Sequence, residues 1–286
     1  MTILITGANG QLGNEMRVLS AQHPEHHYLF TDIQELDITD KAAVLRFLTN
    51  NSIDAIVNCA AYTSVDKAEQ DEDTAFRINA EAPRNLGEAA AAVGARLIHI
   101  STDYVFSGTA CLPYRESDPV APATAYGRTK LAGEQLLLQV CPSAVIIRTA
   151  WLYSSFGNNF VKTMLRLGRE RDTLTVVYDQ IGCPTYAADL AQAVFTILNH
   201  PCPASGIFHF TNEGVCSWYD FTQEILRQAG ISCNVQPIRS EQYQYRTPRP
   251  HYSVLDKQKI KDTFSVKVPY WTEALGRCLC RLAENE

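Results

Sequence analysis

Tyr126 and Lys130 lie four residues apart in a stretch with helical periodicity, and both side chains can take part in proton transfer. Residues four apart on a helix project from the same face, so an ammonium group can lie beside a phenol and favour its ionised form. A phenol with an ordinary pKa of about 10 then becomes a usable proton donor near neutrality. An exposed pair on a solvated helix face is the alternative. Its position after a glycine-rich turn and a hydroxyl-bearing strand end, Ser101-Thr102-Asp103, favours a carbonyl reductase.

The first residues contain a glycine-rich turn between a strand pattern and a helix pattern. Thr2–Thr6 is an apolar, β-branched run, and residues 11–19 place large apolar side chains at helical spacing. Gly7 permits the turn, Gly10 lets the backbone approach a pyrophosphate, and Gly13 allows close helix–strand packing. The spacing is G-x-x-G-x-x-G rather than the more familiar G-x-G-x-x-G. We predict dinucleotide binding here, with a purely structural turn as the alternative.

An acidic residue follows the second predicted strand. Asp32 comes directly after His27–Thr31, where a carboxylate can accept hydrogen bonds from an adenosine ribose. A carboxylate at this place repels a 2′-phosphate, so we expect NADH to be preferred over NADPH, unless a neighbouring Arg or Lys accommodates the phosphate. Asp32 could instead only begin a turn. Asp37 could cap the next helix or lie near the adenine.

Composition excludes several classes of function. The 286 residues can bury one large core or two modest ones, and the net charge of −6 gives no electrostatic footprint for nucleic acid or an acidic membrane. No apolar stretch reaches membrane-spanning length and no leader pattern is present, so we expect a cytoplasmic protein. The nine cysteines include no C-x-x-C pair, which argues against structural zinc and a disulfide framework. His99 lies inside an apolar strand pattern, and we expect it to be a satisfied strand residue.

Strand and helix patterns alternate through most of the first two hundred residues. This alternation predicts an α/β fold: a doubly wound parallel Rossmann sheet, with a smaller C-terminal α/β substrate-binding domain. We place the dinucleotide-binding domain at 1–150 and the mainly sugar-nucleotide-binding domain at 151–286. About 174–210 could belong to the second domain or return to the first sheet. The further predicted strands are Ala55–Asn58, 96–100, 144–148, 174–177 and 206–210, and the predicted helices are about 73–92, 127–138, Trp218–Gln228 and 271–282.

In such a sheet, ligands bind beyond the carboxyl ends of the strands. Gly7, residues 59–62, Ser101-Thr102 and residues 149–151 all follow predicted strands, so we expect them to converge on one cleft. The stretch 242–250 is polar, aromatic and arginine-containing, and we expect it to take part in closing the second domain over a substrate.

The chain resembles the extended short-chain dehydrogenase/reductase superfamily, and within it the dTDP-4-dehydrorhamnose reductase family. The matching stretches span nearly the whole sequence, and several are specific to the family rather than to the superfamily. They are residues 7–13, 58–69, 100–106, 126–130, 148–153, 179–185, 249–250 and 253–256.

The resemblance implies reduction of the 4-keto group of dTDP-4-dehydro-6-deoxy-L-mannose to dTDP-L-rhamnose, the last step of dTDP-rhamnose biosynthesis. NADH or NADPH supplies the hydride. Tyr126 protonates the carbonyl oxygen and Thr102 hydrogen-bonds the developing alkoxide. Lys130 holds the nicotinamide ribose and depresses the pKa of Tyr126.

The resemblance also implies a set of binding residues. Trp151 forms a wall against the sugar or is an ordinary core tryptophan, and Arg249 binds the diphosphate or is a solvated surface residue. Asp103 orients the site or caps a turn. Tyr104 and Asn159 contact the sugar. The expected cofactor-binding residues are Gly7, Asn9, Gly10, Gln11, Leu12, Gly13, Asp32, Asp37, Ile38, Ala60, Ala61, Tyr62, Tyr126 and Lys130.

Some members of the family hold magnesium between subunits, on carboxylates near the positions of Glu15 and Asp189. Both acids are present here. Two scattered acids do not define a metal site, so we assign no metal ligand. We expect a monomer or a homodimer that binds a dTDP-sugar, and no nucleic acid or membrane.

Three other functions fit the same pattern less well. A nucleotide-sugar dehydratase needs an acid/base glutamate after Thr-Asp, where this chain has Tyr104. A nucleotide-sugar epimerase also moves a hydride, but it retains its cofactor, whereas a reductase consumes reduced nicotinamide. A non-catalytic regulatory subunit, such as that of methionine adenosyltransferase, would not need Thr102, Tyr126 and Lys130 together.

Replacing Asp32 with alanine should shift the cofactor preference towards NADPH, because the substitution removes the carboxylate that repels a 2′-phosphate. The measurement is the ratio of kcat/KM with NADH to kcat/KM with NADPH. An unchanged ratio would show that Asp32 does not contact the ribose.

Overall fold

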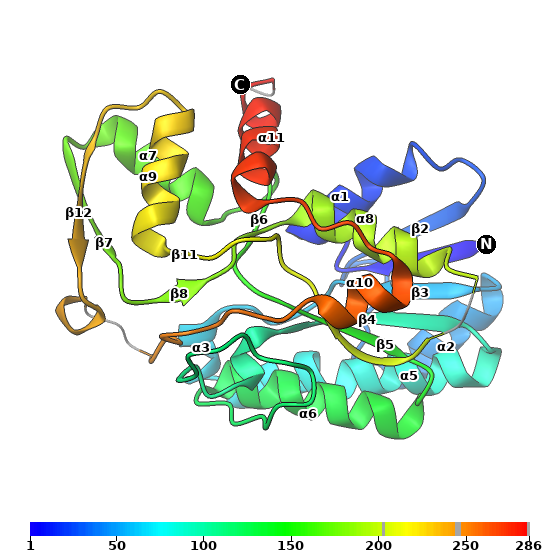
Figure 1. The fold of residues 1–286 in the computed structure, drawn as a ribbon. Helices are drawn as coiled ribbons and strands as arrows, with labels where there is room; N and C mark the ends of the chain where they lie inside the picture. Colours follow the sequence, from blue (N-terminus) through cyan, green and yellow to red (C-terminus); the bar gives the residue numbers. More distant parts are fainter. Residues whose placement is uncertain (202–203, 244–246, 285–286) are drawn as a thin grey trace.

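The computed structural model describes residues 1–201, 204–243 and 247–284 of the chain. Six parallel strands form the main sheet in the order β10-β5-β4-β3-β1-β2. Figure 1 labels four of them, β2, β3, β4 and β5. The order reverses between β1 and β3, which is where a doubly wound sheet opens a crevice for a ligand. The strands are β1 (Thr2–Thr6), β2 (His27–Thr31), β3 (Ala55–Asn58), β4 (Arg96–Thr102), β5 (Val145–Thr149) and β10 (Gly206–His209).

Helices cover both faces of this sheet (Figure 1). The helices α1 (Gln11–Ser20), α8 (Ala187–Leu198) and α10 (Gln258–Phe264) bury one face, with Met16, Val194 and Phe264 in the core. The helices α2 (Lys41–Asn50), α5 (Ala82–Val93) and α6 (Ala125–Val140) bury the other. Because both faces are covered, the strands are almost continuously apolar, as expected of a parallel sheet.

A smaller region packs around a third core. The strands β7 (Thr173–Val177) and β12 (Asn234–Ile238) pair in parallel, and α7 (Phe160–Glu170), α9 (Trp218–Gln228) and α11 (Trp271–Ala283) pack with them. Two short pairs join this region to the sheet. They are β6 (Leu152–Tyr153) with β9 (Thr185–Tyr186), and β8 (Ile181–Gly182) with β11 (Cys216–Ser217).

The remaining elements are short. They are α3 (Val65–Ala68), α4 (Glu72–Phe76), a π-helical stretch at Arg77–Glu81, and 3-10 turns at Asp103–Val105 and Ser240–Gln242. No helix in the part of the chain that the structure describes is both long and apolar enough to cross a membrane. The cysteines in that part are all free thiols, and Cys202 lies outside it.

The predicted fold class is confirmed, and the differences concern individual segments. The helix expected at about 73–92 is helical throughout but includes the π-helical stretch. The two strands expected within 174–210 separate: β7 pairs with β12, whereas β10 joins β5 in the main sheet. The pairing of β12 was not predicted, because that strand is polar and contains Pro237. Of the stretch 242–250, residues 244–246 lie outside the described residues.

A buried ion pair joins α6 to the sheet. The Arg148 guanidinium on β5 donates to both carboxylate oxygens of Glu134, at 2.9 and 2.7 Å, and both side chains are 2 % exposed. Ser101 on β4 donates a third hydrogen bond to Glu134, at 2.5 Å. The pair therefore fixes the position of α6 relative to the two strands whose ends carry Thr102 and Thr149.

Replacing Arg148 with methionine should lower the free energy of unfolding by about 3–5 kcal/mol, because it leaves the Glu134 carboxylate buried without its cation. Urea unfolding at neutral pH measures the change. Arg166→Met is the matched control, since Arg166 and Glu170 form an exposed pair, with side chains 60 % and 52 % exposed; it should change stability by less than about 1 kcal/mol. Equal urea midpoints for the two variants would contradict the structural role of the buried pair.

Candidate active site

The carboxyl ends of β1, β3, β4 and β5 converge on one cleft of about 720 Å³. This is the convergence expected from the strand pattern. Fifteen of the predicted site residues line the cleft. They are Gly7, Gly10, Gln11, Leu12, Asp32, Asp37, Ile38, Ala60, Ala61, Thr102, Asp103, Tyr104, Tyr126, Lys130 and Trp151.

The glycine turn has the geometry of a nucleotide-binding loop. Gly7 has φ +65°, and a Cβ there would lie 2.6 Å from the Ala60 backbone. A Cβ on Gly13 would lie 2.5 Å from the Gly7 carbonyl oxygen, so α1 packs close against the strand. Gly10 caps α1 without a side-chain hydrogen bond, which leaves the first amides of the helix to bind an anion. These residues fit the pyrophosphate of a dinucleotide.

Two acidic residues, Asp32 and Asp37, also line the cleft. Asp32 accepts hydrogen bonds from the backbone amides of Asn9, at 3.1 Å, and Ile33, at 2.9 Å. Asp37 accepts from the backbone and side chain of Thr39. The cap of α2 is Asp40 rather than Asp37, which leaves Asp37 on the cleft wall. Lys130 is the one cation among the described residues that line the cleft.

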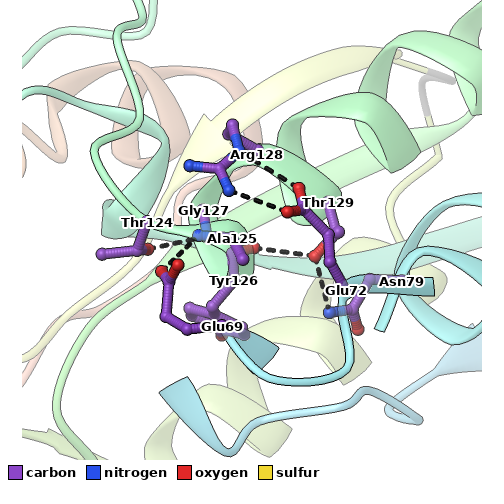
Figure 2. A network of polar contacts seen from close by, with 9 residues as sticks. All are labelled: Glu69, Glu72, Asn79, Thr124, Ala125, Tyr126, Gly127, Arg128 and Thr129. Atoms are coloured by element: carbon purple, nitrogen blue, oxygen red, sulfur yellow. Dashed lines mark hydrogen bonds and ion pairs between the residues drawn. The ribbon is translucent and has the colours of Figure 1, made fainter. Parts of the chain in front are cut away.

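Tyr126 is held by a network at the first turn of α6 (Figure 2). Thr124 caps the helix by accepting from the Gly127 amide at 3.0 Å, and the Glu69 carboxylate accepts from the Ala125 amide at 2.7 Å. Arg128 forms a two-pronged ion pair with Glu72 on α4.

Behind the same turn, Asn79 of the π-helical stretch donates to the Thr129 hydroxyl, which donates to the Tyr126 carbonyl oxygen. Figure 2 shows these contacts around the helix start. Side chains from three separate segments thus fix the direction of Tyr126.

The phenol of Tyr126 has a high proton affinity. Burial raises its pKa to about 12, a hydrogen bond with Thr102 opposes this, and the nearby Asp103 adds to it. The sequence predicts that Lys130 depresses this pKa, but Lys130 is not among the groups that shift it. Instead the Lys130 Nζ donates to the Ile100 carbonyl oxygen at 2.6 Å and lies 3.4 Å from His99 Nε2. Burial lowers the pKa of Lys130 to about 8, so its charged form is less favoured than that of an ordinary lysine.

Asp103 orients the hydroxyl of Thr102. Thr102 Oγ1 donates to Asp103 Oδ1 at 2.9 Å and accepts from the Tyr104 amide, so Thr102 rather than Asp103 caps the short 3-10 turn. The Asp103 side chain is buried, and this burial raises its pKa to about 7. A carboxyl group therefore titrates near neutrality beside the Thr102–Tyr126 pair.

A second pocket of about 600 Å³ adjoins the cleft and shares Tyr104 and Trp151 with it. Trp151 has φ +49°, an uncommon conformation for a bulky residue, and its indole stacks on Trp218 with ring centroids 3.5 Å apart. Such outliers occur preferentially at functional sites. The other residues that line this pocket are Phe160, Met164, Leu167, Arg171, Thr173, Leu174, Thr175, Val176, Val177, Gln180, Trp218, Tyr243, Arg249 and Pro250.

Arg249 lines this pocket. It donates to the Asp66 carboxylate of α3 at 2.7 Å and hydrogen-bonds Tyr104. The two partners come from the first half of the chain, so Arg249 links the smaller region to the main sheet. A guanidinium between the two pockets is chemically suited to a diphosphate.

Four predicted binding residues lie outside the lining of both pockets. Asn9 is exposed beside Asp32, and Gly13 packs inside α1. Tyr62 packs with Tyr126 on a small apolar cluster. Asn159 caps α7 and donates to Gln11 and to the Ser154 carbonyl oxygen, so its polar atoms serve the protein. Its neighbour Asn158 lines the cleft instead.

The sequence also gave no sign of several lining residues. No binding role was predicted for Trp218, Phe160 or Gln180. The packing of α7, α9 and β7 brings them into the same pocket as Trp151. A pair of tryptophans at the ends of apolar segments is the one signal that could have indicated an aromatic binding wall.

Glu15 and Asp189 are both paired with arginine. Glu15 accepts from Arg281 and from Ser154, and Asp189 accepts a two-pronged contact from Arg277. Among the described residues, no group of three or more His, Cys, Asp or Glu could hold a metal ion.

Comparison with known proteins identifies the family. A model described as the RmlD substrate binding domain matches residues 1–284. The chain belongs to this family.

Three relatives illustrate this similarity. A crystal structure of a dTDP-4-dehydrorhamnose reductase from Clostridium acetobutylicum is 45 % identical, with a TM-score of 0.95 over 99 % of this chain and 100 % of that one. A Bacillus anthracis dTDP-4-dehydrorhamnose reductase in complex with NADP is 40 % identical, with a TM-score of 0.93 over 98 % and 99 %. A probable dTDP-4,6-dihydroxy-2-methyloxan-3-one 4-ketoreductase from Streptomyces antibioticus is 42 % identical over 96 % of this chain and 93 % of its own.

Replacing Asp103 with asparagine should stabilise the protein increasingly as the pH rises. The folded chain keeps the Asp103 proton to about pH 7, whereas the ordinary value is 3.8. Between these values the folded state binds more protons than the unfolded state, so this group makes stability fall with rising pH. Urea unfolding from pH 4 to pH 7 should show a growing advantage of Asp103→Asn over the parent. Asp73→Asn, at an exposed position, is the control; parallel curves for parent and Asp103→Asn would contradict the assignment.

Proposed function

We propose that this protein is an NAD(P)H-dependent reductase of the 4-keto group of dTDP-linked 6-deoxy-sugars. Its proposed substrate is dTDP-4-dehydro-6-deoxy-L-mannose, which it converts to dTDP-L-rhamnose. The carrying observation is that Thr102, Tyr126 and Lys130 all line the cleft at the strand ends, next to a second pocket that shares Tyr104 and Trp151 with it. A cofactor and a sugar nucleotide can therefore meet at Tyr126.

The residues of the site have distinct roles in this proposal. A nicotinamide cofactor supplies the hydride that reduces the carbonyl carbon. Tyr126 gives its proton to the oxygen, and its raised pKa means that the phenol is fully protonated at neutral pH before the reaction. Thr102 has one hydroxyl proton, which it donates to Asp103 in this structure; in the reaction it turns this proton to the same oxygen as negative charge develops there.

The smaller region is proposed to hold the sugar nucleotide. The Trp151–Trp218 stack offers a flat apolar wall, and Arg249 and Arg171 offer positive charge to the diphosphate. Within 151–286, the segment that contains α8 and β10 packs on the main sheet and does not line this pocket. We therefore propose that the boundary at about residue 150 divides cofactor binding from sugar-nucleotide binding. In packing, however, α8 and β10 belong with the main sheet of the first domain.

NADH is the proposed preferred cofactor. The adenosine end of the cleft presents Asp32 and Asp37, and the described residues that line the cleft include no cation there for a 2′-phosphate. The Bacillus anthracis relative in complex with NADP weighs in the other direction.

The relatives support a 4-keto reductase and leave the choice of sugar to experiment. Two of them carry the name dTDP-4-dehydrorhamnose reductase, and the third is a probable 4-ketoreductase of a different dTDP-sugar. Incubating the purified protein with each keto-sugar nucleotide and NADH, then identifying the sugar formed, tests the proposal. Stoichiometric loss of NADH separates a reductase from an epimerase, and no loss with any keto-sugar would favour a non-catalytic role.

Replacing Tyr126 with phenylalanine should lower kcat at least about 100-fold while NADH binding stays nearly unchanged, because only the proton donor is removed. Initial rates give kcat, and NADH fluorescence gives the cofactor affinity. Tyr62→Phe is the matched control, since Tyr62 packs on the same small cluster but does not line the cleft. Near-normal turnover of Tyr126→Phe would contradict the proposed donor.

A further inference from the structure

A row of buried polar side chains leads from Thr6 on β1 to Lys130 on α6. Thr6 on β1, Asn58 on β3, His99 on β4 and Lys130 on α6 are each at most 1 % exposed. The Thr6 hydroxyl donates to Asn58 Oδ1 at 2.7 Å, and Asn58 Nδ2 lies 3.0 Å from His99 Nδ1. On the other side of the ring, His99 Nε2 lies 3.4 Å from Lys130 Nζ.

The direction of these hydrogen bonds follows from one fixed donor. The Ala60 backbone amide can only donate, and it lies 3.1 Å from the Asn58 side-chain oxygen. The Asn58 amide nitrogen must therefore face His99, where it donates to Nδ1. Burial lowers the pKa of His99 well below its ordinary value, so the ring is neutral. A neutral imidazole that accepts at Nδ1 carries its proton on Nε2, the atom that faces Lys130.

We propose that His99 is a positioning residue of the reduction: its Nε2–H, fixed by Asn58 and Thr6, favours the uncharged form of the Lys130 amine. The proposal rests on the proposed function, because it assigns this role within the same site. His99 is a buried strand residue with a polar contact at each ring nitrogen, as the sequence predicts, and the proposal adds a function to it.

The hydrogen-bonding capacity of Lys130 supports this role. An ammonium group has three donors and no acceptor. A charged Lys130 would therefore point an N–H at the Nε2–H of His99, and the two donors would repel each other. A neutral amine can donate to the Ile100 carbonyl oxygen and accept from His99 Nε2–H at the same time. The lowered pKa of Lys130, about 8 through burial, agrees with this arrangement.

Other charged and titratable groups surround the pair. On α6, Glu134 raises the pKa of Lys130, but its charge is largely balanced by Arg148 of β5. Tyr126 on α6 and Asp103 after β4 face the cleft. Cys59 after β3 is buried, and burial raises its pKa to about 12, so it stays a neutral thiol. None of these groups supplies a donor to Lys130, and His99 does.

The proton transfer closes a cycle. When Tyr126 has given its proton to the alkoxide of the product, it is a phenolate. The Lys130 ammonium can transfer a proton to that phenolate, which restores the phenol and leaves a neutral amine that accepts from His99 Nε2–H. The amine then regains a proton from water in the cleft. Turnover thus needs Lys130 protonated, and it falls as the pH rises through the Lys130 pKa.

Replacing His99 with glutamine tests the proposal in the full-length protein. A glutamine places an amide near the Nε2 position, and its oxygen can accept from the ammonium. The titration midpoint of Lys130 should rise by about one pH unit, tenfold in proton affinity. It is measured by NMR of lysine labelled with ¹³C at Cε, with Lys130→Met to assign the signal. The alkaline limb of the kcat–pH profile should rise by the same amount, and His27→Gln, at an exposed position on β2, should leave both unchanged.

An unchanged Lys130 midpoint in His99→Gln would overturn the proposal. Should that variant not fold, ¹⁵N NMR of the imidazole in the unaltered protein decides: protonated Nε2 with bare Nδ1 supports the proposal, and protonated Nδ1 overturns it. The NMR midpoint needs no substrate. A shifted midpoint in a protein that reduces no keto-sugar nucleotide would therefore support the His99–Lys130 interaction and contradict the proposed function.

Discussion

Two charged side chains one turn apart on α6, Lys130 and Glu134, are buried against β4 and β5, and the active site depends on how their charges are compensated. Glu134 is paired with Arg148 and also accepts from Ser101. Lys130 has no carboxylate partner in the described structure, and its contacts are the Ile100 carbonyl oxygen and a neutral histidine. The paired carboxylate of Glu134 holds α6 in place, whereas the Lys130 amine is free of a carboxylate partner in the described structure and can change its protonation state.

The difference between Glu134 and Lys130 explains how α6 can be held rigidly and still carry an amine whose protonation state can change. The first turn of α6 is tied to Glu69, Glu72 and Asn79, which lie in three segments of the preceding crossover. One turn further on, the buried amine has a lowered proton affinity because burial disfavours its charge. A rigid support around a group whose protonation state can change is what proton transfer at a fixed position needs.

The two pockets are formed by different parts of the chain and meet at Tyr104 and Trp151. The first is formed by the ends of parallel strands, where a doubly wound fold binds dinucleotides. The second is formed mostly by α7, α9 and β7, and Arg249 links it to Asp66 of the first half. Under the proposed function, this shared wall would bring the cofactor and the substrate together at Tyr104 and Trp151.

The amino-acid sequence by itself determined the elements and the order of the chemical groups along them. Thr2–Thr6, His27–Thr31 and Ala55–Asn58 have the predicted bounds, and Tyr126 and Lys130 share a helix, because apolar spacing, glycine turns and helical periodicity are local properties. Only the tertiary structure decided that Asn159 caps a helix, that Trp151 stacks on Trp218, and that Lys130 lies against Ile100 and His99. These outcomes depend on burial and on partners distant in sequence, which set protonation and hydrogen bonding and which no local pattern contains.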